Sequence, residues 1–188
     1  MLSYQGGYMR KILVVVDMQN DFITGCLGNE ECVAVVPAVV DTIMSGNYDE
    51  VAVTRDTHHE DYLKTQEGRK LPVEHCIENT EGWELADEVK NAIENSFDEN
   101  NIRYFNKSVF GSVELAEYLS KQEEKNEGLV IDFVGVCTGI CVISNVMLAK
   151  AFCTNADIRV IANACACVSP KSHNTALEAM KTCQVDIL

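Results

Sequence analysis

Short runs of β-branched and apolar residues alternate with segments of helical periodicity along nearly the whole chain, and this alternation limits the fold more than any other feature. The first run, residues 12–16, is continuously apolar, as expected for a strand that is buried on both faces. Consecutive parallel strands are joined by long crossovers, which are usually helices. The sequence therefore predicts an α/β fold, with a doubly wound parallel sheet of about six strands and helices on both faces.

The periodicity also places the individual elements. The predicted strands cover residues 12–16, 50–54, 102–105, 129–136, 158–162 and 185–188, and the predicted helices cover residues 31–44, 83–93, 113–119, 140–152 and 172–181. The longest stretch without regular structure runs from Asp56 to about Gly82. Long loops inside compact domains are usually functional, so this loop is a candidate part of the site.

Length and charge limit the class of protein. The 188 residues are expected to form one domain over residues 11–188, preceded by an N-terminal extension, residues 1–10, with either Met1 or Met9 as the native start. Acidic residues outnumber basic ones by 29 to 15, giving a formal charge of −14, which argues against nucleic acid or an anionic membrane as partner. The first apolar stretch is too short for a signal peptide or a membrane span. The nine cysteines are therefore expected to be reduced, and the location cytoplasmic.

Chemically reactive side chains follow the ends of the first four predicted strands. In doubly wound sheets, ligands bind beyond the carboxyl ends of the strands, so these side chains are expected to meet. In strand order they are Asp17, then Asp56 and His58, then Lys107, and finally Cys141.

Cys141 has the surroundings of a nucleophile. The strand before it stops at Val136, Thr138 and Gly139 make a turn, and the predicted helix then places Cys141 in its first turn. Free backbone N–H groups and the helix dipole favour a thiolate there. With the carboxylate of Asp17 as base and the ammonium of Lys107 as its counter-charge, the set suits acyl transfer through a thioester.

The long loop contains a second group of candidate ligands: Asp56, His58, Glu67 and His75. Aspartate and histidine are common in loops that bind nothing, but imidazole and carboxylate together suit zinc or a similar divalent ion.

Four motifs give the chain a family resemblance. They are residues 16–22 (VDMQNDF), 54–58 (TRDTH), 107–112 (KSVFGS) and 135–141 (GVCTGIC). In this order, each after a strand, they make residues 11–188 similar to the isochorismatase-like cysteine hydrolases, and within them to the nicotinamidases and pyrazinamidases. The resemblance implies a three-layer Rossmann-like fold, hydrolysis of a small-molecule amide, nicotinamide to nicotinate and ammonia in NAD salvage, and homo-oligomers.

The resemblance also implies roles for particular residues. Asp17 would be the general base and acid, Lys107 its charge partner and Cys141 the nucleophile. A cis peptide would precede Cys137, and the backbone N–H groups of Cys137 and Cys141 would form the oxyanion hole.

For the loop, the resemblance implies a divalent metal, zinc with manganese or iron as alternatives, held by Asp56, His58, Glu67 and His75. Glu67 is open to replacement by His59 or Asp61. Phe22 would stack on the substrate ring. Several nicotinamidases carry a tryptophan just before the last metal histidine, where this chain has residues 71–74 (LPVE), so Tyr62 or Leu71 is expected to line the pocket instead.

Two other functions remain open on the sequence alone. One is a different amidase of the same scaffold, acting on a carbamoyl or ureido compound. The other is a non-catalytic family member. The isochorismatases proper lack the nucleophilic cysteine, so Cys141 directs the prediction toward amides.

Overall fold

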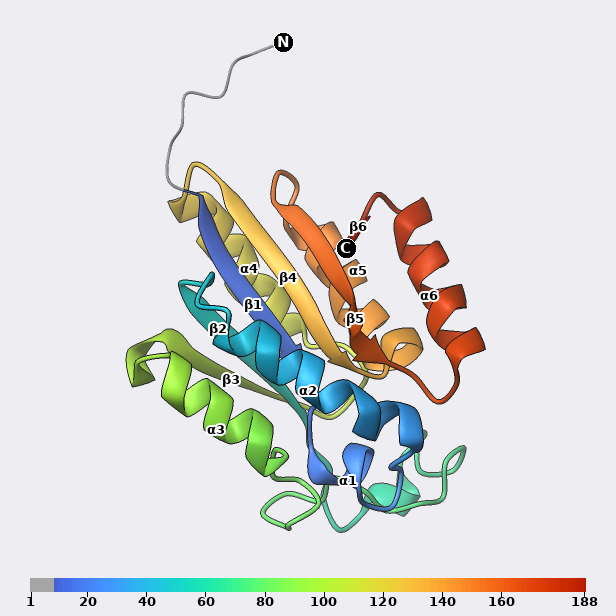
Figure 1. Ribbon diagram of the computed structural model, residues 1–188. Helices are drawn as coiled ribbons and strands as arrows, with labels where there is room; N and C mark the ends of the chain where they lie inside the picture. The colour runs from blue at the N-terminus through green and yellow to red at the C-terminus, as the bar shows by residue number, and fades with distance from the viewer. Residues whose placement is uncertain (1–8) are drawn as a thin grey trace.

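The computed structural model describes residues 9–188, which form a six-stranded parallel sheet in the order β3-β2-β1-β4-β5-β6 (Figure 1). Of the N-terminal extension expected over residues 1–10, residues 1–8 lie outside the described residues, and Arg10 already begins the first strand. The strands are β1 (Arg10–Val16), β2 (Glu50–Asp56), β3 (Ile102–Lys107), β4 (Leu129–Val136), β5 (Asp157–Ala166) and β6 (Asp186–Ile187). The predicted α/β class and the parallel sheet are confirmed.

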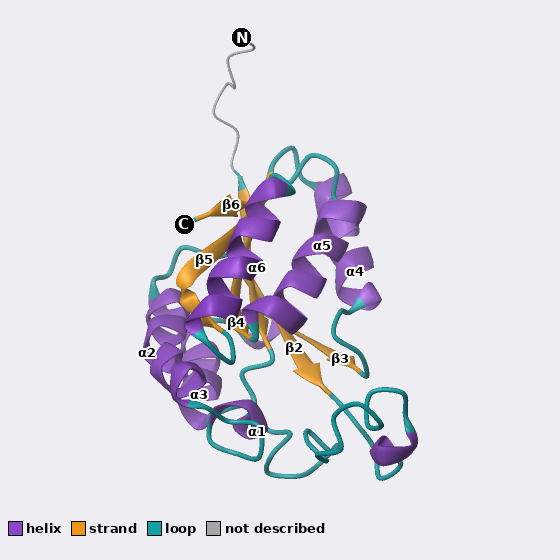
Figure 2. Ribbon diagram, turned by 90° about the vertical axis from the view of Figure 1, so that its right-hand side faces the viewer, coloured by secondary structure: helices purple, strands orange, loops and turns teal. Residues whose placement is uncertain are grey.

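Helices cover both faces of the sheet (Figure 2). They are α1 (Asn20–Ile23), α2 (Glu30–Met44), α3 (Asp87–Ser96), α4 (Val113–Lys125), α5 (Ile143–Phe152) and α6 (Pro170–Thr182). Helices α2 and α3 pack on one face, and α4, α5 and α6 on the other. Among residues 9–188, no helix is both long and apolar enough to cross a membrane.

Strand β1 lies at the centre of the sheet and divides its side chains between two cores. Ile12, Val14 and Val16 belong to the core under α4, α5 and α6. Leu13 and Val15 belong to the core under α2 and α3. Burial on both faces explains why this strand is continuously apolar rather than alternating.

Gly135 brings the carboxyl ends of β1 and β4 close together. Its φ is +115°, and a Cβ atom at this position would lie 2.2 Å from the carbonyl oxygen of Val16. A side chain is therefore excluded on both conformational and steric grounds. The close approach places Asp17, which follows β1, beside the turn that follows β4.

Several element boundaries differ from the sequence prediction, and three of these differences lie near the site. Strands β2 and β3 extend to Asp56 and Lys107, so these two residues end their strands rather than follow them. Helix α3 begins at Asp87, whereas the periodicity predicted a start at Trp83. The indole N–H of Trp83 donates to Thr57 Oγ1 at 2.9 Å, and its carbonyl accepts from Gln19, so tertiary hydrogen bonds hold this segment out of the helix.

Candidate active site and metal centre

A buried ammonium group lies at the centre of the candidate site. Lys107 Nζ is 2.6 Å from Asp17 Oδ2, 3.6 Å from Cys141 Sγ and 3.3 Å from Asp56 Oδ1. Lys107 is only 5% exposed, so these groups supply its charge compensation. The structure thus brings together the side chains that the sequence placed after four separate strands.

The carboxylate of Asp17 is held by contacts on both oxygens. Oδ1 accepts a hydrogen bond of 2.6 Å from Thr54 Oγ1, and Oδ2 faces Lys107. The main chain of Asp17 has a positive φ of 48°, which turns the chain sharply out of β1. The carboxylate also lies close enough to the Cys141 thiol for each group to shift the pKa of the other, which is the proximity that a general base needs.

Burial and neighbouring charges shift the pKa values of both Asp17 and Lys107. Complete burial raises the pKa of Asp17 above its ordinary value, although the Lys107 charge opposes that shift. For Lys107, burial alone would lower the pKa, but the neighbouring Asp17, Cys141 and Asp56 raise it above its ordinary value. The ammonium therefore stays charged at neutral pH, and it stabilises the ionised form of Asp17.

Cys141 differs from the sequence prediction in two respects. It lies in a π-helical turn, Thr138–Val142, which precedes α5, and not in the first turn of a regular helix. Its thiol is also not favoured as a thiolate: burial first, and then the charge of Asp17, raises the pKa of Cys141 well above its ordinary value. At rest the thiol is neutral and lies beside Asp17, so it must lose its proton during attack.

This protonation state predicts the reactivity of the thiol. The rate of alkylation of Cys141 by iodoacetamide is expected to rise with pH without a plateau up to about pH 9, because the thiolate fraction stays small. Peptide mass mapping measures this rate against exposed Cys183 in the same sample. In an Asp17→Asn variant the rate at pH 8 should increase, since the charge that opposes the thiolate is removed, while Cys183 is unaffected. A plateau below pH 7 in the wild type would contradict the prediction.

The turn between β4 and α5 carries the residues proposed for the oxyanion hole. The Val136–Cys137 peptide is cis, as the family resemblance implied. The carbonyl of Cys137 accepts hydrogen bonds from the N–H groups of Ile140 and Val142, at 3.0 and 3.1 Å, which closes the turn around Cys141. The oxyanion role of the Cys137 and Cys141 N–H groups remains a prediction.

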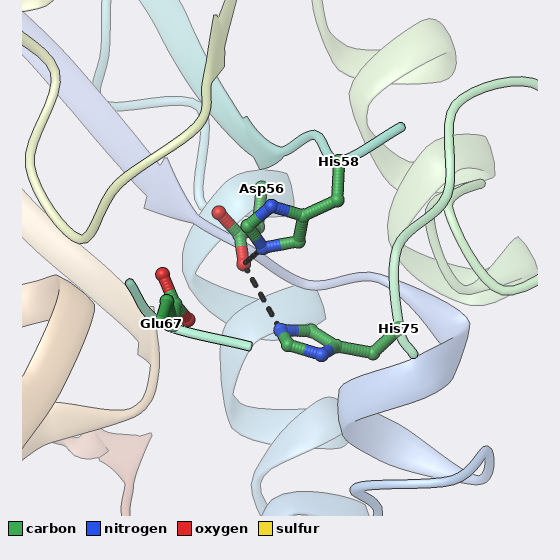
Figure 3. A group of neighbouring side chains, drawn as sticks. All are labelled: Asp56, His58, Glu67 and His75. Atoms are coloured by element: carbon green, nitrogen blue, oxygen red, sulfur yellow. Dashed lines mark hydrogen bonds and ion pairs between the residues drawn. The ribbon is translucent and has the colours of Figure 1, made fainter. Parts of the chain in front are cut away.

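The four predicted metal ligands also converge (Figure 3). One ligand atom from each of Asp56, His58, Glu67 and His75 lies within 4.8 Å of all the others. Asp56 Oδ2 is 3.1 Å from His58 Nε2 and 3.5 Å from His75 Nε2. Burial alone would raise the pKa of Asp56, but the neighbouring histidines and the charge of Lys107 bring it below its ordinary value.

The donor set fits a divalent ion. His75 Nδ1 lies 2.8 Å from the carbonyl oxygen of Val73, which can only accept, so Nδ1 carries the proton and Nε2 keeps its lone pair for a metal. Two ligands of a tetrahedral zinc ion lie about 3.3 Å apart, close to the 3.1 and 3.5 Å between Asp56 Oδ2 and the two histidine nitrogens. The alternatives to Glu67 point elsewhere: His59 is exposed and 3.7 Å from Glu78, and Asp61 is exposed.

The residues predicted to line the pocket differ in burial and in their contacts with the metal-ligand histidines. The Phe22 ring packs edge-on against His75, with 5.6 Å between ring centroids. Tyr62 is fully buried against His58 and His75, and its hydroxyl donates to the carbonyl of Leu71 at 2.9 Å. Leu71 is 38% exposed. Phe22 and Tyr62 therefore support the histidines directly, whereas Leu71 lies at the rim.

Several buried polar side chains around the site were not predicted from the sequence. Thr54 holds Asp17, as described above. Asn145 donates to the carbonyls of Cys141 and Phe110 and accepts from the N–H of Ser112, which ties the nucleophile turn to the loop after Lys107. The signal available in the sequence was a polar residue inside an otherwise apolar strand or helix, which does not reveal the partner.

Comparison with known proteins agrees with the observed fold. The isochorismatase domain family matches residues 11–188. A nicotinamidase structure from Bacillus subtilis is similar, with 25% identity, a TM-score of 0.80, and coverage of 95% of this chain and 99% of that one. The pyrazinamidase of Pyrococcus horikoshii, solved in complex with zinc, has 23% identity and a TM-score of 0.75, with coverage of 95% and 98%. No curated protein sequence matches the chain.

Proposed function

Because this chain belongs to the isochorismatase family, we propose that it is an amide hydrolase with Cys141 as nucleophile, and that its substrate is nicotinamide. One observation carries the proposal: the buried ammonium of Lys107 contacts the Asp17 carboxylate, the Cys141 thiol and Asp56. Asp56 is the first of the four candidate metal ligands, which are called the metal group below. The likeness to nicotinamidase structures supports the choice of substrate. The products would be nicotinate and ammonia, as in NAD salvage in the cytoplasm.

The attack follows from the resting protonation state. As Cys141 Sγ bonds to the carboxamide carbon, the neighbouring Asp17 carboxylate accepts the thiol proton. The C=O electron pair moves onto oxygen, where the N–H groups of Cys137 and Cys141 would stabilise it. Lys107 keeps Asp17 ionised before the attack and remains close to the charge that develops.

The proton then returns to the leaving group. The C–N bond breaks, Asp17 gives its proton to the departing nitrogen, and ammonia leaves a thioester on Cys141. A water molecule attacks the thioester while Asp17 takes its proton, the C–S bond breaks, and the thiol regains a proton. One carboxylate thus serves in turn as base and acid, which its contact with the thiol allows.

Asp56, His58, Glu67 and His75 would hold a divalent ion, with zinc as the proposed occupant and manganese or iron as alternatives. When bound, the ion supplies a Lewis acid that can orient a pyridine ring through its nitrogen. Phe22 packs edge-on against His75, and Tyr62 packs against both His58 and His75, so these rings hold the liganding histidines in place. This arrangement favours nicotinamide over a carbamoyl or ureido compound, which has no ring nitrogen.

Ammonia release from nicotinamide tests the proposal. The zinc-loaded protein is expected to release ammonia from nicotinamide and from pyrazinamide. Removal of the metal with a chelator should lower the rate by at least about 10- to 100-fold, and added zinc should restore it. Parallel reconstitution with manganese and iron identifies the preferred ion. Absence of ammonia release from nicotinamide by the metal-loaded protein would overturn the substrate assignment, and a carbamoyl substrate would then be tested under the same conditions.

A further inference from the structure

Gln19 is a fully buried amide that the mechanism above does not use. Its side chain makes three hydrogen bonds: Nε2 donates to the carbonyls of Asp56 and Trp83, both at 2.8 Å, and Oε1 accepts from the N–H of Asp56 at 2.7 Å. The amide is therefore satisfied entirely by main-chain groups, and two of them belong to one residue of the metal group.

The position of Gln19 in the fold explains this pairing. Strands β1 and β2 are in register as far as Val16 and Thr54, and the chain then turns away at Asp17. The Gln19 amide pairs with the N–H and C=O of Asp56, as a peptide group of a neighbouring strand would. Beyond the end of β1, the main chain of Asp56 is thus held by the Gln19 side chain and not by a neighbouring strand.

The main chain of Gln19 is also connected to the acid–base residues, since its N–H donates to the carbonyl of Asp17 at 2.8 Å. Its side chain fixes Asp56, whose carboxylate faces two ways: Oδ1 lies 3.3 Å from Lys107 Nζ, and Oδ2 faces the two histidines. A small rotation of the Asp56 main chain would move one of these oxygens away from its partners.

We propose that Gln19 is a positioning residue that holds the main chain of Asp56, so that one carboxylate serves both the metal group and the Lys107 ammonium. Gln19 touches none of the proposed reacting atoms, so its effect passes through Asp56. The inference rests on the proposed function for its catalytic consequence, but its effect on metal binding is measured without any substrate.

The test is the zinc affinity of the purified protein, measured by competition with a chromogenic chelator. Gln19→Met keeps the length of the side chain and removes all three hydrogen bonds. Its zinc dissociation constant is expected to rise by about 10- to 100-fold. Gln19→Asn keeps the amide but shortens the side chain, so its zinc dissociation constant should rise by a smaller factor. This variant provides the test if Gln19→Met does not fold. Saturating zinc should restore much of the nicotinamide hydrolysis in either variant.

Asn145 provides a matched control on the other side of the site. It is also a buried amide that donates to two carbonyls and accepts from one N–H, but it contacts the nucleophile turn and no metal ligand. Asn145→Leu should lower the melting temperature as Gln19→Met does, yet leave the zinc dissociation constant within about twofold of wild type. Equal zinc affinities in wild type and a folded Gln19 variant, or equal weakening by Asn145→Leu, would overturn the proposal. A protein that binds zinc but does not hydrolyse nicotinamide would overturn the proposed function alone.

Discussion

Replacement of Cys141 by alanine is expected to abolish ammonia release from nicotinamide, with a fall in kcat of about 10⁴-fold or more. Cys141 is the thiol that contacts both Asp17 and Lys107, and without sulfur no thioester can form. Water activated by Asp17 alone would have to attack the amide directly. The measurement is a coupled ammonia assay on the purified, zinc-loaded variant, together with its zinc content.

The control for this loss is another buried thiol near the same helix. Cys153, 2% exposed, follows the C-terminal end of α5, whereas Cys141 lies in the turn before that helix. Cys153→Ala removes a similar volume from the same core without touching the site, so its kcat should match that of the wild type. Cys141→Ala should also bind zinc with unchanged stoichiometry, since the thiol is not among the metal group. Ammonia release by Cys141→Ala at the wild-type rate would exclude the nucleophilic role.

The strands and the position of the site could be predicted because they depend on local pattern. A strand buried on both faces must be apolar throughout, and reactive residues at its carboxyl end must meet those of its neighbours. The contact of Lys107 with Asp17 and Cys141 follows from these two rules and from the order of the motifs. The family resemblance likewise implied that Asp56 and His75 would meet.

What could not be predicted depends on burial and on contacts between distant segments. The helix dipole suggested a thiolate at Cys141, but the cost of desolvation and the charge of Asp17 outweigh it. The periodicity around Trp83 suggested a helix, but its hydrogen bond to Thr57 and the one from Gln19 hold it in a turn. In each case a tertiary interaction outweighs a local preference that is worth only about 1 kcal/mol or less.

Lys107 is where stability and catalysis are most closely linked. Its ammonium compensates two buried carboxylates: Asp17, which is 0% exposed, and Asp56, which is 2% exposed. Breaking a buried ion pair by removing one partner is strongly destabilising, because the remaining charge stays buried and uncompensated. Loss of the ammonium would also raise the pKa of Asp17 further, so that Asp17 would hold a proton and could not accept one from the thiol.

Lys107→Met is therefore expected to lower the free energy of unfolding at pH 7 by about 3–5 kcal/mol, measured by urea denaturation of the metal-free protein, and to lower kcat by at least about 100-fold. Because the native variant would bind more protons than the unfolded chain, its stability should fall as pH rises from about 4 toward 8. The double variant Lys107→Met/Asp17→Asn separates the two effects, since it removes the uncompensated carboxylate together with the base. It should recover part of the lost stability and none of the activity. If the double variant is less stable than Lys107→Met, the buried charge of Asp17 is not the source of the destabilisation, and if it regains activity, Asp17 is not the base.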